Sequence, residues 1–338
     1  MRVIISRYAP APTGYLHLGH VLNAIYVWGI TRLAEAREDL RASGGGAERR
    51  ILLRIEDHDA QRSRKIYEAA ILEDLAWLGF IADGSAVHQS ERGEIYERAL
   101  ATLRSRGLVY ACGCSRKEVQ EVQEGQEVQK VQKVQEVQEV QEVQEVQEVQ
   151  EERGARGFSR AAREICYPGT CRDRNLADGP GTSLRVRLEP TIERFVDLRL
   201  GPQEQRPAEQ CGDFVLRDRE GNWTYQFAAA VDDFDQGVTH VIRGEDLLES
   251  TGRQIALARL LGRTEPARFL HHGLLMKSAT QKISKSDGDT GVRELRARGW
   301  TPENVIGLAA AQAGLIPFPR AVRAADVSSI MSLEERPA

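Results

Sequence analysis

The feature that most constrains the fold is an alternation of two kinds of apolar segment in the N-terminal part of the chain. RVIISRYAP at residues 2–10 has the continuous apolar character of a buried strand, and from Leu18 the apolar residues follow helical spacing until Ser43 and three glycines end the pattern. ILLRIEDHD at residues 51–59 is typical of a second buried strand, and residues 66–80 follow with a second helical pattern. The order strand, helix, strand, helix predicts an α/β fold built on a parallel sheet.

Polar motifs lie where both predicted strands end. Because ligands of parallel sheets collect at the carboxyl ends of the strands, we expect functional residues in RYAPAP and in EDHD. A Pro-Thr-Gly turn after the first strand puts His17 and His20 at the start of a helix, where unpaired backbone N–H groups and the helix dipole favour an anion. Imidazoles in this position can hydrogen-bond to phosphate oxygens. A zinc pair or two packed histidines is the alternative interpretation.

A second polar motif lies near the other end of the chain, in HHGLLMKSATQKISKSDG at residues 271–288. Lys282 and Lys285 flank a serine in a segment rich in Gly, Ser and Asp, which alone is typical of a solvated basic loop. Together with the histidine motif, it indicates two clusters that close on one triphosphate. Adenylyl transfer needs such clusters, because its rate depends on positioning the reactants and on stabilising charge on the phosphate oxygens.

The middle of the chain carries a triplet repeat, VQE, from residue 119 to residue 151. A valine at every third position spirals around a helix, so the repeat should bury no continuous face, and either a solvated helix or disorder is compatible with it. We expect a low-complexity insertion without chemistry. Eleven Glu and two Lys between Glu118 and Glu152 give this segment a net charge of −9, so the rest of the chain carries +5 although the whole chain carries −4. That remainder is compatible with a phosphate-rich partner.

The cysteines and the N-terminus indicate the compartment. The chain has five cysteines, an odd number that cannot all form pairs within it, and they cluster in one third of its length. Both observations favour reduced thiols or a metal site over a disulfide framework. The N-terminus lacks the ordered regions of a secretory signal, and no apolar run is long enough to span a membrane. We therefore expect a cytoplasmic protein.

Five motifs in order resemble the catalytic domain of the glutamyl-tRNA synthetases, which are class I aminoacyl-tRNA synthetases: RYAPAPTGYLHLGH, LRIEDHDAQRS, WTYQFAAAVDD, THVIRGEDLLEST and KISKS. The resemblance runs from about residue 5 to residue 310. A CGC motif, the sequence YPGTCRDR and only 52 residues after Ser286 are most similar to the glutamyl-queuosine tRNA(Asp) synthetases, shortened relatives without the anticodon-binding domain.

This resemblance implies a ligase with the class I Rossmann-type parallel sheet. It activates L-glutamate with ATP to glutamyl-adenylate and transfers the glutamate to the queuosine base in the anticodon of tRNA(Asp). Mg²⁺ would accompany the ATP, and we expect a monomer. Two alternatives remain open: a truncated glutamyl-tRNA synthetase that charges the 3′ end of its tRNA, and a non-catalytic RNA-binding paralogue. Intact HLGH and KISKS motifs favour catalysis.

The resemblance also implies the site residues. The glutamate site would comprise Arg7 and Arg243 on the side-chain carboxylate, Glu56 on the ammonium group, and Tyr225, Ala9 and Ala11 in the pocket wall. Paired guanidinium groups suit a planar carboxylate and would be underpaired by glutamine. The family usually has Ser at the position of Ala11. The ATP site would comprise His17, Gly19, His20 and Lys285. The catalytic residues would be His17, His20 and Lys285, with Lys282 behind Lys285.

The cysteine motifs imply one structural Zn²⁺ in an inserted domain that contacts the RNA. The implied ligands are Cys112, Cys114, Tyr167 and Cys171. A gap of 52 residues separates Cys114 from Tyr167, and Cys166 offers a competing thiolate, although neighbouring residues in an extended chain point to opposite sides. Reduced structural thiols are the alternative. We expect Cys211 to be a small buried residue beside a strand.

These motifs divide the chain into four parts. They are the first half of the Rossmann-type catalytic domain (1–110), the inserted zinc and RNA-contact domain with the repeat (111–205), the second half of the Rossmann-type domain (206–275), and the KISKS loop with a helical region that contacts the RNA stem (276–338).

Overall fold

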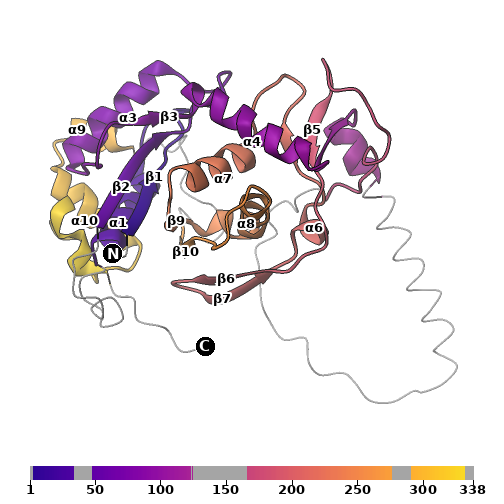
Figure 1. Cartoon of the computed structure of the whole chain (residues 1–338). Helices are drawn as coiled ribbons and strands as arrows, with labels where there is room; N and C mark the ends of the chain where they lie inside the picture. The colour runs from indigo at the N-terminus through magenta and orange to yellow at the C-terminus, as the bar shows by residue number, and fades with distance from the viewer. Residues whose placement is uncertain (1–2, 34–47, 123, 125–165, 276–290, 332–338) are drawn as a thin grey trace, which may run out of the picture.

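The computed structural model describes residues 3–33, 48–122, 124, 166–275 and 291–331 (Figure 1). The alternation predicted for the N-terminal part is confirmed. It forms strand β1 (Val3–Tyr8), helix α1 (Leu18–Leu33), strand β2 (Glu48–Ile55) and helix α3 (Lys65–Leu78). β1 and β2 are parallel, as the α/β prediction requires, with Val3 opposite Glu48.

The catalytic sheet is assembled from two halves. The first has the order β1, β2, β3 (Val87–His88), and the second has the order β9 (His240–Gly244), β10 (Arg268–His272), β6 (Glu193–Asp197), β7 (Gly201–Gln205). All pairings in them are parallel except that of β6 with β7. Backbone N of Thr239 donates to the carbonyl of Ile5 at 2.9 Å, which places the start of β9 beside β1. The strand order therefore reverses between β1 and β9, the place where α/β sheets bind ligands.

The largest core lies around α1, which is buried against the sheet on one side and against C-terminal helices on the other. Tyr8 and Trp28 meet edge to face at 5.5 Å between ring centroids, and the indole nitrogen of Trp28 donates to the carbonyl of Ile81. Figure 1 shows α9 (Val292–Ala297) and α10 (Pro302–Gln312) beside α1 and α3, and a short 3₁₀ segment, η3 (Ala324–Ile330), also packs on α1. This packing fixes the start of α1, where the histidine motif lies.

A separate antiparallel sheet forms the other end of the molecule. It consists of β4 (Val109–Cys112), β5 (Ser183–Val186) and β8 (Val215–Arg217). It shares a core with four helices: α4 (Gly93–Ser105), α6 (Pro207–Gln210), α7 (Tyr225–Asp235) and α8 (Thr251–Leu260). Two further short 3₁₀ segments, η1 (Gln89–Glu91) and η2 (Glu245–Ser250), precede α4 and α8.

The strand pairing divides the chain differently from the sequence motifs. β6 and β7 lie within the proposed insertion at residues 111–205, yet β6 pairs with β10 of the catalytic sheet and β7 pairs with β6. β8 lies outside those limits, yet it pairs with β5. The reason is physical: a strand's partner is set by hydrogen-bond register between distant segments, which a local apolar pattern does not encode.

The sequence also led to predictions about membrane-spanning segments and about the VQE repeat. In the part of the chain that the structure describes, no helix is long and apolar enough to cross a membrane. Most of the VQE repeat lies outside the described residues. Its first valine, Val119, is buried against Tyr110, Cys112, Tyr167 and Cys171, so the repeat begins with one residue that does contribute to a core.

Candidate active site

Arg7 and Arg243 lie near the carboxyl ends of β1 and β9, on the two sides of the strand-order reversal. Each side chain is only 4% exposed. A guanidinium group is buried in proteins when its N–H groups have acceptors, so the partners of these two arginines decide what the site can bind.

Arg7 is paired with a carboxylate. Its Nε donates to Oδ1 of Asp233 at 2.9 Å, and its Nη1 donates to the carbonyl of Ile242 at 3.3 Å. The same oxygen of Asp233 accepts from Nη1 of Arg54 at 2.7 Å. Burial alone would raise the pKa of Asp233, but the charges of Arg7 and Arg54 outweigh it and lower this pKa to about 2. Asp233 is therefore an ionised bridge between two buried arginines.

Glu56 completes this group of charges at the end of β2. Its Oε1 accepts from Nη2 of Arg54 at 3.3 Å, and its backbone N donates to the carbonyl of Pro10 at 3.0 Å, which ties the EDHD segment to the turn after β1. Burial raises the pKa of Glu56, and the opposing effects of Arg54 and Arg7 are smaller. A buried carboxylate with this balance gains from an added cation, such as an ammonium group.

Arg243 is held mainly by neutral acceptors. Its Nε donates to Nε2 of His271 at 3.0 Å, its Nη1 to Oε1 of Gln254 at 2.7 Å, and its Nη2 to Oγ1 of Thr251 at 2.8 Å. Burial lowers the pKa of Arg243, and the nearby charge of Arg7 acts in the same direction. The two guanidinium groups therefore repel each other mildly, and an anion placed between them would relieve that repulsion.

The remaining residues predicted for the glutamate site surround these charges. Tyr225 is the first residue of α7, and burial followed by the charge of Glu56 raises its pKa, so it is a neutral phenol. Ala9 and Ala11 are half-buried in the turn after β1, where the backbone N of Thr13 donates to the carbonyl of Ala11 at 2.8 Å. The structure therefore brings Arg7, Glu56, Tyr225 and Arg243 into one electrostatically connected group.

His17 and His20 stack at the start of α1, with ring centroids 3.9 Å apart. Nδ1 of His17 accepts from the backbone N of Gly19 at 3.0 Å, and Nδ1 of His20 accepts from the backbone N of His17 at 3.1 Å. Because both Nδ1 atoms act as acceptors, each neutral ring carries its proton on Nε2. The pair thus offers two N–H donors beside a helix N-terminus, which suits an anionic ligand.

Gly19 also has a steric role. A Cβ atom at this position would lie 2.9 Å from Cε1 of His17, so a side chain would displace the imidazole. This is a physical reason for glycine between the two histidines, in addition to the close approach of a nucleotide that the resemblance implies.

Lys282 and Lys285 lie outside the described residues. The described chain resumes at Gly291, which forms an antiparallel bridge with His17, and backbone N of Val292 donates to the carbonyl of Leu16 at 2.9 Å. The chain from Gly291 onward, which follows the KISKS motif in sequence, is therefore anchored beside the histidine pair.

The sequence did not identify several buried polar residues of the site. They are Arg54, Asp197, Asp233, Thr251, Gln254 and His271. For Arg54, a signal exists: a single arginine within the apolar stretch ILLRI must be buried with a counter-charge if the strand is central. For the others, the partners are set by the order of the strands and by the packing of α7 and α8 on them.

Three thiols and one phenol converge in the second predicted site. The Sγ atoms of Cys112, Cys114 and Cys171 all lie within 4.8 Å of one another, and this group of cysteines could hold a metal ion. Sγ of Cys112 is 3.3 Å from the hydroxyl of Tyr167, and Sγ of Cys114 is 3.4 Å from Sγ of Cys171. Ligand sulfurs of tetrahedral Zn²⁺ are about 3.8 Å apart for bonds of about 2.3 Å, so these donors fit a zinc ion.

The neighbouring cysteines lie elsewhere. Sγ of Cys166 points to the carbonyl of Glu209 at 3.5 Å, and Sγ of Cys211 to the carbonyl of Pro207 at 3.1 Å. Of the two adjacent candidate ligands, Tyr167 and Cys166, the structure places the hydroxyl of Tyr167 beside the sulfurs of the cysteine cluster. The thiol of Cys166 points elsewhere. Cys211 is buried.

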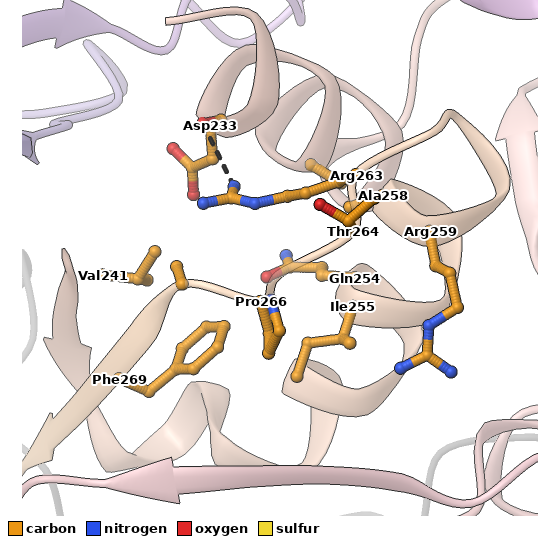
Figure 2. Close-up of a pocket in the computed structure, with 12 residues that line it drawn as sticks. Asp233, Val241, Gln254, Ile255, Ala258, Arg259, Arg263, Thr264, Pro266 and Phe269 are labelled. Carbon is orange, nitrogen blue, oxygen red and sulfur yellow. Dashed lines mark hydrogen bonds between the residues drawn. The ribbon is translucent and has the colours of Figure 1, made fainter. Parts of the chain in front are cut away.

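Two hollows lie near the catalytic sheet. A small one of about 30 Å³ lies behind Asp233, between α8 and the strands β9 and β10, and has room only for water (Figure 2). There Arg263 donates to the backbone carbonyl of Asp233 at 3.3 Å. A larger cleft of about 690 Å³ runs from Tyr167 to Gln226. Because Gln226 accepts from Gln254, this cleft borders the Arg243 group.

Comparison with known proteins agrees with this geometry. Residues 3–311 match the family described as tRNA synthetases class I (E and Q), catalytic domain. The chain is similar to a glutamyl-Q tRNA(Asp) synthetase of Rhodobacter capsulatus, with 36% identity over 90% of this chain and 100% of the relative. It is also similar to a glutamyl-Q tRNA(Asp) synthetase of Symbiobacterium thermophilum, with 35% identity over 99% of this chain and 94% of the relative.

Among solved structures, the fold is similar to a glutamate tRNA ligase from Elizabethkingia meningosepticum, with a TM-score of 0.68 and 24% identity. That alignment covers 98% of this chain and 65% of the ligase, so this chain spans about two thirds of the ligase's length. The class I fold predicted from the motifs is therefore confirmed. The family match and the two relatives together show that this chain belongs to the glutamyl-Q tRNA(Asp) synthetase family of class I tRNA synthetases.

Proposed function

We propose that this chain activates L-glutamate with ATP to form glutamyl-adenylate and transfers the glutamate to the queuosine base of tRNA(Asp). The observation that carries the proposal is the buried pair of arginines at the strand-order reversal, with Glu56 beside them. Two guanidinium groups and one carboxylate provide opposite charges for the side-chain carboxylate and the ammonium group of one amino acid.

In this proposal, the substrate's side-chain carboxylate binds between Arg7 and Arg243, and its ammonium group binds near Glu56. Glutamine would offer one acceptor and one donor to groups that only donate, so it would leave an arginine underpaired. Tyr225 supplies a neutral wall that can donate a hydrogen bond.

The Nε2–H groups of His17 and His20 would bind the triphosphate at the start of α1. Lys285, with Lys282 behind it, would stabilise charge on the transferring phosphate. Mg²⁺ bound with the ATP would supply additional positive charge to the phosphates. The α-carboxylate of glutamate then attacks the α-phosphorus, and pyrophosphate leaves.

We also propose roles outside this site. Cys112, Cys114, Tyr167 and Cys171 would hold one structural Zn²⁺, which would connect β4 to the chain beyond the repeat. The larger cleft would admit the RNA base, because four arginines line it: Arg116, Arg185, Arg219 and Arg253. A monomeric enzyme in the cytoplasm completes the proposal. Its four sequence segments are those given above, except that β6 and β7 of the second segment join the catalytic sheet and β8 of the third joins the antiparallel sheet.

Glutamate-dependent exchange of pyrophosphate into ATP without tRNA, followed by transfer of labelled glutamate to tRNA(Asp) with and without queuosine, tests the proposal. We expect exchange without tRNA and labelling only with queuosine. Exchange that requires tRNA(Glu) would favour the truncated glutamyl-tRNA synthetase. Absence of exchange under both conditions would favour the non-catalytic RNA-binding paralogue.

A matched pair of variants distinguishes a role of Arg243 in binding the substrate from the general effect of removing an arginine from a strand. Arg243→Gln should abolish detectable exchange, because it removes a buried charge that faces the substrate. Arg194→Gln is the control, since Arg194 lies on the same sheet but its side chain is 70% exposed and pairs with Glu204 at the surface. Equal activity of the two variants would contradict the proposed carboxylate site.

A further inference from the structure

We infer that Asp197 and His271 are positioning residues that orient Arg243 without neutralising its charge, and thereby select glutamate over glutamine. This inference rests on the proposed function and deepens it. Neither residue would touch the substrate; both would act through Arg243.

The three side chains form a polar line across three neighbouring strands. Asp197 ends β6, His271 lies in β10 and Arg243 lies in β9, and the sheet order is β6, β10, β9. In the strand register, His271 is directly opposite Arg243. All three are buried, and His271 is fully inaccessible to solvent. Polar groups buried this deeply need defined partners, so their hydrogen bonds fix the protonation of each one.

Asp197 determines the tautomer of His271. Its carboxylate accepts from the backbone N atoms of Arg199, Leu200 and His271, at 2.9, 2.9 and 3.0 Å. These bonds, together with His271, lower the pKa of Asp197 although burial acts in the opposite direction. An ionised carboxylate only accepts, so Nδ1 of His271, 2.7 Å from Oδ2, must carry the proton.

The other ring nitrogen therefore presents a lone pair to Arg243. Nε2 of His271 accepts from Nε of Arg243 at 3.0 Å and lies 3.1 Å from Oγ1 of Thr251. Burial lowers the pKa of His271, so the ring is neutral. The imidazole thus fixes the plane of the guanidinium group while adding no negative charge.

Arg7 shows what a charged partner does instead. Its Nε donates directly to the carboxylate of Asp233, which partly compensates its charge before a substrate arrives. Within the described residues, no carboxylate is hydrogen-bonded to Arg243. Asp233 is not hydrogen-bonded to Arg243 and offsets its charge only in part. Most of that charge is left for the substrate, and a charged acceptor gains more from it than a neutral amide does. This difference assigns the larger share of the discrimination to Arg243.

Three variants test the inference by the pyrophosphate exchange assay with glutamate and with glutamine. His271→Glu places a carboxylate on Arg243 and should lower the ratio of kcat/KM for glutamate over glutamine by roughly tenfold or more. Asp197→Asn frees the tautomer and should raise KM for glutamate by about tenfold, with kcat changed less than about threefold. His271→Gln keeps a neutral acceptor at the Nε2 position and should retain the ratio within about threefold.

His240→Gln is the control variant. His240 begins β9 and bonds to Thr239, away from Arg243, and should change neither the ratio nor KM. An unchanged ratio in His271→Glu, or the same loss in His271→Gln and His271→Glu, would overturn the inference, because a structural role would not separate these two.

Nitrogen NMR of the wild-type protein labelled at histidine gives a readout that needs no activity and, of the variants, only a folded His271→Gln for assignment. We expect His271, assigned by its loss in His271→Gln, to be neutral with the proton on Nδ1. A proton on Nε2, or a charged ring, at neutral pH would overturn the inference alone. If the wild-type protein does not activate glutamate, the proposed function fails. If it does activate glutamate but the variants or the tautomer differ from expectation, only the inference fails, so the two failures are distinguishable.

Discussion

The proposed substrate site and the cysteine cluster are both buried groups of titratable residues, but they balance charge in opposite ways. In the substrate site, Asp233 lies between Arg7 and Arg54, and Glu56 contacts Arg54. In the cluster, four acidic groups face one another, and the guanidinium group of Arg185 covers only the ring face of Tyr167, at 3.6 Å from its centroid.

This difference separates a site organised by protein charges from a group of residues that could hold a metal ion. The proposed substrate site holds its arginines in place without a ligand, as catalysis by positioning demands. In the cluster, burial raises the pKa of Cys114 to about 12, while backbone and thiol hydrogen bonds outweigh burial and lower that of Cys171 to about 7. Several thiolates can coexist there only if a metal ion compensates their charge.

Removal of the metal should therefore have the largest effect. We expect the protein to contain about one zinc per chain, and Cys114→Ser or chelation to cost several kcal/mol of stability, since zinc-binding energy contributes directly to folding. Calorimetry together with metal analysis measures both. Cys166→Ser is the control, because its sulfur points to Glu209. Equal metal content and equal Tm in the two variants would refute the assignment.

Asp233→Asn should have the next largest effect. It leaves Arg7 and Arg54 buried without their shared counter-charge, which typically costs about 3–5 kcal/mol. Glutamate-dependent exchange should fall together with the free energy of unfolding, measured in urea. Asp235→Asn in the same helix is the control, because Asp235 is about half-exposed and pairs with Arg92 at the surface. A variant as stable as the control would show that the bridge is dispensable.

Asp74 is a buried acid outside both groups, and it tests whether its charged neighbour or its burial decides its protonation state. It is fully buried in α3, its oxygens have no hydrogen-bond partner among the described residues, and burial raises its pKa from 3.8 to about 6 although Arg293 lies 3.5 Å away. The folded state therefore binds the proton more tightly than the unfolded chain, and the stability that the protonated form contributes is lost as pH rises through about 6.

Asp74→Asn should remove that loss. We expect the variant to be more stable than the wild type at pH 8 by up to about 3 kcal/mol, with the difference vanishing near pH 4. Urea denaturation at several pH values measures this. A variant that is destabilised at pH 8 would show that the ion pair with Arg293 outweighs burial.

Sequence-based prediction succeeded for local segments and failed for the buried partners that the fold brings together. Local patterns sufficed for β1, α1, β2 and α3, because apolar periodicity reports burial within one segment. The motif residues Arg7, Glu56, Tyr225 and Arg243 were identified by resemblance, and the structure places them together. Their buried partners were not identified. Asp233 ends one quoted motif and His271 begins another, but the residues that Asp197, His271 and Asp233 contact depend on the order of strands β6, β10 and β9 and on the packing of α7.

Deletions within the VQE repeat should have the smallest effect, and they test where in the sequence the core of the cysteine cluster ends. Val119 is buried against Cys112 and Tyr167, whereas residues 125–151 carry the same triplet with no buried face expected from its spacing. Deletion of residues 125–151 should leave glutamate-dependent exchange within about twofold, since lengthening or shortening a loop changes closure entropy by only about 0.6 kcal/mol per doubling. Extending the deletion to remove Val119 should lower Tm and zinc content while the exchange rate at low temperature persists. If the shorter deletion alone abolishes exchange in a folded protein, the repeat takes part in activation, and the separation between the two sites would have to be abandoned.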